Sequence, residues 1–161
     1  MDLIITAFTA LLVGAIYYLL IQALATEVDI FFQADTIKFK TKYKVLSLAP
    51  ILHISKLRKR SRLLGVGLDF NTNEPSYQVD LLNYEKSQNV RDKKMKLTDF
   101  YSVFFRHSFI QLLERKVFLI TKVNIHGINT INHITDENVE YVVTKALKLA
   151  GAVKFKVIST H

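Results

Sequence analysis

The chain begins with an unbroken apolar segment. Residues 3–25 read LIITAFTALLVGAIYYLLIQALA, and no charged residue lies between Asp2 and Glu27. A helix of this length rises about 35 Å, and the hydrocarbon core of a bilayer is roughly 30 Å thick. Ala23 and Ala25 also fit a signal-peptide cleavage site, but the segment is long for a signal peptide and no Lys or Arg precedes it. The pattern predicts a retained transmembrane signal-anchor over residues 3–25.

Alternation of apolar and polar residues predicts strands later in the chain. Over residues 36–45, Ile37, Phe39, Tyr43 and Val45 share one face and four lysines share the other. Residues 63–84 alternate on both sides of a turn at 71–75, which predicts a hairpin. Residues 116–127 are apolar on both faces, as in a central strand, and residues 153–157 predict a final strand.

Two segments have helical periodicity. Residues 99–115 are rich in aromatic side chains, and the segment from Thr135 or Asp136 to Ala150 repeats apolar residues at helical spacing before Gly151. The predicted fold is α+β, with one transmembrane helix and one soluble domain. Its parts are the helix over 3–25, a juxtamembrane linker over 26–35, and a basic domain over 36–161 with a mixed or antiparallel sheet and two helices.

Charge adds a predicted orientation. The chain of 161 residues carries 22 Lys+Arg and 14 Asp+Glu, a formal net charge of +8, and every Lys and Arg follows the apolar segment. Basic residues favour the cytoplasmic side of a membrane. We therefore expect the N-terminus outside and the domain on the cytoplasmic or matrix side, in a bacterial inner membrane or an organelle inner membrane.

The composition of the chain excludes several kinds of functional site. The chain has no cysteine, which excludes disulfides, thiolate metal sites and a cysteine nucleophile. No His-Glu-x-x-His, Gly-x-Ser-x-Gly or phosphate-loop motif is present, so we predict no catalytic, cofactor or metal-binding residue. Nucleic acid is not the expected partner, because Phe39 and Tyr43 alternate with the neighbouring lysines and face away from them.

Three sets of residues are candidates for contact with partners. Small and polar residues that recur every fourth position are the candidates for helix packing: Thr6, Ala10, Gly14, Tyr18 and Gln22. The densest basic run is the candidate for anionic lipid or an acidic partner: Lys56, Arg58, Lys59, Arg60 and Arg62. The aromatic content of the segment 99–115 exceeds what one buried face needs, which makes three residues candidates for a protein interface: Phe100, Phe104 and Phe105.

Together these patterns predict a non-catalytic structural or assembly subunit of a larger membrane complex. Its expected partners are the lipid bilayer and other membrane-protein subunits. One alternative is a membrane-tethered module that binds anionic lipid or an acidic partner through the basic run. A second alternative is an enzyme whose active-site residues come from separated strands.

Overall fold

The computed structural model describes residues 2–24, 26–57, 62–68, 70, 72–84, 96–114, 120–128 and 139–158, with side chains from residue 5 to 19 in the first helix and from 122 in β7. Within these residues the chain is α+β, with three helices and two sheets. The helices are α1 (Asp2–Leu24), α2 (Leu97–Leu113) and α3 (Val139–Leu149). The strands are β1 (Thr26–Phe32), β2 (Ile37–Lys40), β3 (Val45–Leu48), β4 (Ile51–Ser55), β5 (Leu63–Val66), β6 (Ser76–Asp80), β7 (Ile120–His126) and β8 (Ala152–Ile158).

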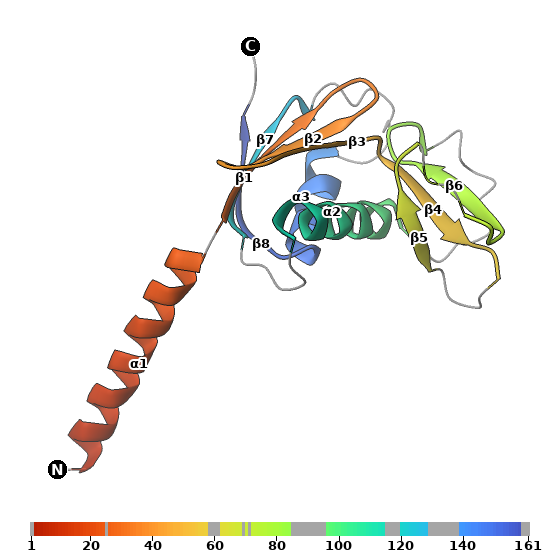
Figure 1. The fold of residues 1–161 in the computed structure, drawn as a ribbon. Coiled ribbons are helices and arrows are strands. Elements are labelled where there is room, and N and C mark those ends of the chain that lie inside the picture. The colour runs from red at the N-terminus through yellow and green to blue at the C-terminus, as the bar shows by residue number, and fades with distance from the viewer. Residues whose placement is uncertain are drawn as a thin grey trace.

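The larger sheet has the strand order β3-β2-β1-β7-β8. β1, β2 and β3 form an antiparallel meander, and β7 and β8 run parallel to β1. The helices α2 and α3 precede these two parallel strands and pack on one face of the sheet (Figure 1). This arrangement confirms the predicted helix over 99–115, the predicted central strand and the predicted last strand.

The predicted linker is the first correction, because its first seven residues are β1, the middle strand of the larger sheet. Val28, Ile30 and Phe32 are buried beneath the helices, whereas Glu27 and Asp29 point to the opposite face. The alternation that marks a half-buried strand is therefore present. The two carboxylates conceal it in the sequence, because acidic residues are depleted in strands.

The single strand predicted over 36–45 is two strands joined by a tight turn. The side chain of Thr41 accepts hydrogen bonds from the N–H groups of Tyr43 and Lys44, at 3.3 Å and 3.0 Å. The backbone N–H of Thr41 also donates to the carbonyl oxygen of Lys44. Threonine side chains that bond nearby backbone groups stabilise turns, and this turn reverses the chain between β2 and β3.

The smaller sheet has the order β5-β4-β6, and it corrects the predicted hairpin over 63–84. β5 and β6 do not pair with each other, because β4 lies between them and pairs antiparallel with both. The strand β4 was not predicted from the sequence. Four consecutive residues of this strand are buried, from Leu52 to Ser55, so the strand lacks the two-residue alternation that identifies half-buried strands.

The core lies where α2 contacts both sheets. Phe39 of β2 packs against the rings of Phe104, Phe105 and Phe109, with ring centroids 5.9–6.3 Å apart. Leu52 of β4 and Val79 of β6 belong to the same buried cluster. One hydrophobic core therefore joins the two sheets, and α2 is the element they share (Figure 1).

The predicted transmembrane helix is also corrected. In the part of the chain that the structure describes, no helix is long and apolar enough to cross a membrane.

Candidate functional site

The outer face of the larger sheet, opposite the helices, carries a cluster of polar side chains. Alternation along the parallel strands β1 and β7 places these residues side by side, because Asp29 is in register with Asn124 and Phe31 with His126. We call this group the outer-face cluster: Glu27, Asp29, Phe31, Lys122, Asn124 and His126. The cluster could not be predicted from the sequence, because its β1 members lie more than 90 residues before its β7 members and only strand pairing joins them.

Hydrogen bonds connect the centre of the outer-face cluster. The amide Nδ2 of Asn124 donates to Glu27 Oε1 at 3.0 Å and to Asp29 Oδ1 at 2.7 Å. The Lys122 ammonium lies 2.8 Å from Glu27 Oε1. Hydrogen bonds from Lys122 and then from Asn124 hold the pKa of the Glu27 carboxyl below its ordinary value. Glu27 is thus a stabilised carboxylate, the opposite of what a general acid at neutral pH requires.

His126 lies at the edge of this cluster. Its ring stacks on Phe31, with centroids 4.4 Å apart and an angle of 13° between the planes. Its Nε2 atom is shielded from solvent, lies 3.7 Å from Asp29 Oδ1 and makes no hydrogen bond within the described residues. No three His, Asp or Glu side chains of the described chain are grouped so that they could hold a metal ion. The cluster is where a dispersed active site would lie, but its carboxylates are already satisfied by Asn124 and Lys122.

The smaller sheet carries a second polar group on its outer face. The Ser55 hydroxyl donates to the Glu74 carboxylate and accepts a hydrogen bond from the N–H of Leu57. The Nε2 atom of His53 lies 2.8 Å from the carbonyl oxygen of Gly67, beneath the ring of Phe70. A serine nucleophile needs a base that accepts its proton and is itself oriented by a third group. The hydrogen bond of Ser55 goes to Glu74, so these residues do not form a serine–histidine pair.

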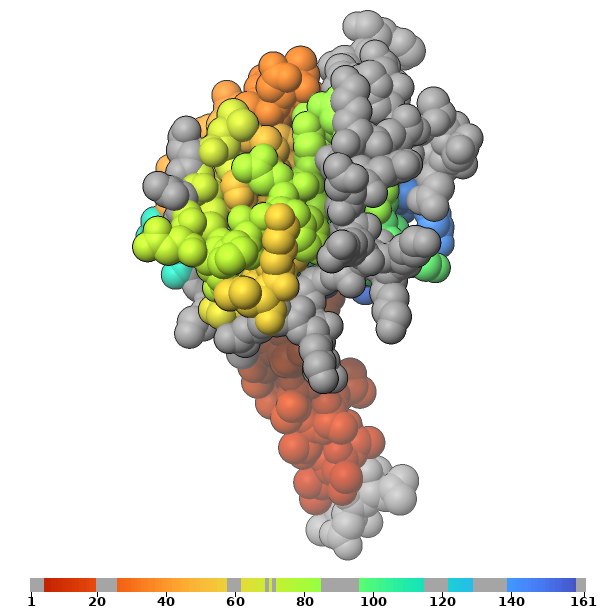
Figure 2. All heavy atoms as spheres, turned by 90° about the vertical axis from the view of Figure 1, so that its right-hand side faces the viewer, coloured from red at the N-terminus to blue at the C-terminus, as the bar shows by residue number. Residues whose placement is uncertain are grey.

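Helix α1 has a different character, because its described side chains are apolar and exposed. Figure 2 shows the helix extending clear of the α/β domain. A shallow apolar groove of about 600 Å³ runs along one side, lined by Thr6, Thr9, Ala10, Val13, Gly14 and Tyr17. Three of the predicted packing residues, Thr6, Ala10 and Gly14, lie in this groove. Tyr18 is exposed and does not line it, and the side chain of Gln22 lies outside the described residues.

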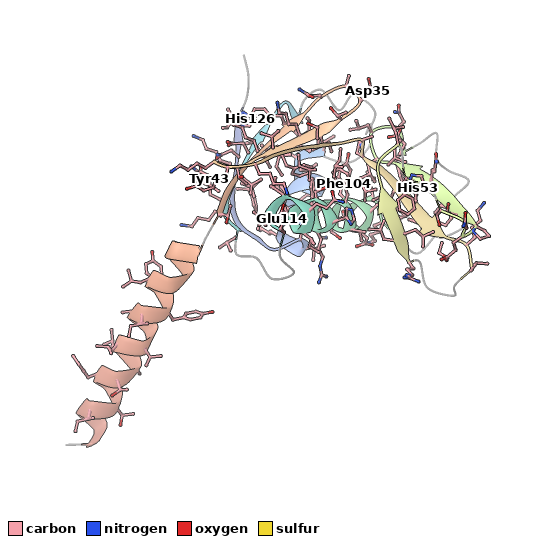
Figure 3. The ribbon with its side chains drawn as sticks, viewed as in Figure 1. Asp35, Tyr43, His53, Phe104, Glu114 and His126 are labelled. Carbon is pink, nitrogen blue, oxygen red and sulfur yellow. The ribbon has the colours of Figure 1, made fainter. Side chains whose placement is uncertain are left out.

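The other predicted contact residues are placed as follows. Lys56 and Arg62 are exposed at the two ends of the connection from β4 to β5, and Arg58, Lys59 and Arg60 lie outside the described residues. The three aromatic residues proposed for an interface are fully buried: Phe100, Phe104 and Phe105. Figure 3 shows Phe104 pointing into the space between α2 and the larger sheet. The high aromatic content of α2 is explained by its packing against two sheets instead of one.

No known protein family and no curated protein matches this sequence.

Proposed function

We propose that this chain is a non-catalytic subunit of a larger protein assembly, and that α1 is the element through which it joins. The observation that supports the proposal is the exposure of large apolar side chains around the whole circumference of α1. At 100° per residue, these side chains point in all directions around the helix axis: Ile5, Phe8, Leu11, Leu12, Val13, Ile16, Tyr17, Tyr18 and Leu19.

An exposed surface of this kind needs a partner. A surface helix of a globular protein has one apolar stripe, whereas a helix that is apolar all round is found in surroundings that exclude water. Contiguous exposed apolar patches larger than a few hundred Å² mark interaction sites. The described residues of the domain leave these side chains exposed. We propose that apolar helices of partner subunits cover them.

The groove on α1 favours helix packing over loose hydrophobic contact. Ala10 and Gly14 leave the backbone accessible at its centre. The Thr9 hydroxyl, at its end, donates to the Ile5 carbonyl oxygen at 2.8 Å, and its oxygen atom can still accept a hydrogen bond. Small residues allow a second helix to approach closely, and hydroxyl groups can bond across the contact. The predicted membrane location and N-terminus-out orientation stay predictions. The alternative of anionic lipid or an acidic partner at the basic run also stays a prediction, with Lys56 and Arg62 exposed for it.

The test is the native mass of the chain extracted from its source in mild detergent, with the co-purifying chains identified. A defined particle much heavier than the 18.5 kDa chain is the expected result. A lone monomer at the same extraction conditions would contradict the proposal.

Substitutions on α1 locate the contact. Gly14→Leu is expected to weaken the assembly about tenfold, as the loss of one close helix contact does. A Cβ atom added at Gly14 meets no other atom within 4 Å, so the chain itself has room for the new side chain. The matched control is Ala15→Leu, which adds apolar volume on the opposite side of the helix. Equal effects of the two variants would show that the groove is not the contact.

A further inference from the structure

One end of the α/β domain combines exposed aromatic and aliphatic side chains with lysines. This is the end closest to α1, because β1 begins two residues after α1 ends. Thr26, the first residue of β1, pairs with Ile120 of β7, and Ile120 pairs with Ala152 of β8, so β7 and β8 begin at the same end. The turn between β2 and β3 points toward the same end, because β2 runs antiparallel to β1 and its last residue, Lys40, is opposite Asp29. Figure 3 shows Tyr43 at this end and Asp35 at the other. We call it the α1-proximal surface: Lys42, Tyr43, Val45, Lys148, Leu149, Val153 and Lys154.

The apolar members of this surface are well exposed. Tyr43 is 88% exposed at the tip of the β2–β3 turn, and Val45 is 52% exposed beside it. Leu149 and Val153 are 60% and 62% exposed on the two sides of the turn from α3 to β8. The two turns are separated by three strand spacings, which is about 14 Å. The protein therefore presents two apolar points at one end of the domain, far enough apart to rest on a flat surface.

Lysines surround these apolar points. The Nζ atom of Lys42 lies 5.4 Å from the centre of the Tyr43 ring, and that of Lys148 lies 5.3 Å from the centre of the Phe155 ring. Within the described residues, no carboxylate lies at ion-pair distance from Lys42, Lys148 or Lys154. The nearby carboxylates are already paired, Glu114 with Lys44 and Glu27 with Lys122. The excess charge of this surface is thus positive.

From this combination we infer that the α1-proximal surface docks on an anionic phospholipid surface. Tyrosine is enriched where a protein meets the headgroups, because its ring is apolar and its hydroxyl is polar. Lysine places its alkyl chain along the apolar boundary and its ammonium among the phosphates. The residues that make the contact all belong to the α/β domain, so the contact requires no membrane-crossing helix. It is also independent of the proposed function and of the basic run at 56–62.

The chain contains no tryptophan, so the substitution Tyr43→Trp places a single indole fluorophore at the tip of the turn. The probe is the full chain mixed with phosphatidylcholine vesicles in which about one third of the lipid is phosphatidylserine. We expect the indole emission of the Tyr43→Trp variant to shift to shorter wavelength and to be quenched by brominated acyl chains. The matched control is Tyr141→Trp, because Tyr141 is exposed on α3 and also has a lysine 5.4 Å from its ring centre. We expect the control emission to be unchanged.

Lysine substitutions test the electrostatic part. The triple variant Lys42→Gln, Lys148→Gln, Lys154→Gln is expected to reduce the preference for anionic over neutral vesicles about a hundredfold, at roughly 1 kcal/mol per lysine. The triple variant Lys38→Gln, Lys96→Gln, Arg106→Gln removes the same charge elsewhere on the domain and should keep the preference within a few fold. Circular dichroism verifies that both variants fold.

Three results would overturn the inference. Vesicle binding by the Tyr43→Trp variant with no change in its indole emission would show that α1 alone contacts the vesicle. Equal losses in the two triple variants would show that only net charge matters. An emission shift of the Tyr43→Trp variant with poly-glutamate and none with anionic vesicles would assign the surface to an acidic protein.

Discussion

Tyr101 of α2 is fully buried, and its side chain is hydrogen-bonded to the backbone next to the smaller sheet. Its hydroxyl donates to the carbonyl oxygen of Leu81 at 3.2 Å, just beyond the end of β6. Burial, and secondly the charge of Asp80, raise the pKa of this phenol well above its ordinary value. The folded protein therefore holds the phenolic proton more tightly than the unfolded chain does.

A stability prediction follows at this residue. Because the folded-state pKa is raised, the stabilisation is complete below the unfolded pKa of about 10 and is lost as the pH rises above it. Tyr101→Phe is expected to lower the free energy of unfolding by about 1 kcal/mol at neutral pH, since the Leu81 carbonyl loses its partner. The variant should also lose less stability between neutral and alkaline pH than the parent chain. Urea unfolding across that pH range measures both effects.

The control for this prediction is Tyr43→Phe, which removes a hydroxyl exposed to solvent and should leave the unfolding curves unchanged. Parallel pH profiles for Tyr101→Phe and the parent chain would contradict the argument.

Individual residues were predictable from the sequence only where local chemistry decided their place. The apolar residues of α3 were assigned to one face by their spacing, and Val142, Val143, Ala146 and Leu147 are buried. The pairing of Asn124 with Glu27 and Asp29 was not predictable, because a strand pattern does not say which strand lies beside it. The outer-face cluster is produced entirely by that pairing.

At the scale of elements, the end of α2 shows how a helix is joined to a hairpin. Glu114 follows the last turn with φ of 53°, in the left-handed region that favours glycine. The ammonium of Lys44, in the β2–β3 turn, lies 3.1 Å from the carbonyl oxygen of Gln111 and also pairs with the Glu114 carboxylate. The lysine thereby satisfies a carbonyl that the helix end leaves without an intrahelical partner.

Glu114→Gly is therefore expected to raise the melting temperature by a few degrees. The substitution relieves the left-handed backbone, and the exposed ion pair that it removes contributes little. Thermal unfolding followed by circular dichroism measures the change. Glu114→Ala separates the two contributions, because it removes the ion pair and keeps the strained backbone, and it should not raise the melting temperature. A decrease for both variants would mean that the ion pair outweighs the strain.

Elements with a strong period were predicted well, and the others were not. The helical pattern located α2 and α3, and the run of apolar residues located β7 as a central strand. β4 was missed because it is buried on both faces but only five residues long. Strand pairing was predicted least well. The predicted hairpin of β5 with β6 assumed that strands adjacent in sequence are adjacent in the sheet, whereas β4 lies between them. Register and strand order depend on long-range packing that one sequence does not display.

At the scale of the whole molecule, the two sheets share one core. Leu52 from the smaller sheet and Ile30 from the larger sheet are both fully buried in the cluster around α2. Leu52→Ala and Ile30→Ala should each lower the free energy of unfolding by about 2–5 kcal/mol. Because the core is continuous, each variant should lose both sheets in one transition. Hydrogen exchange of the β4 and β7 amides during urea unfolding measures this, with Leu68→Ala, an exposed site, as the control.

Separate midpoints for β4 and β7 in either variant would contradict this prediction and would make the smaller sheet an independent folding unit.

The junction between α1 and β1 has a mechanical consequence. β1 begins two residues after α1 ends, and it is hydrogen-bonded along both edges, to β2 on one side and to β7 on the other. Tension applied to α1 along the strand direction is therefore carried in shear by two hydrogen-bonded ladders at once. A force that a partner exerts on α1 therefore acts directly on the middle strand of the larger sheet.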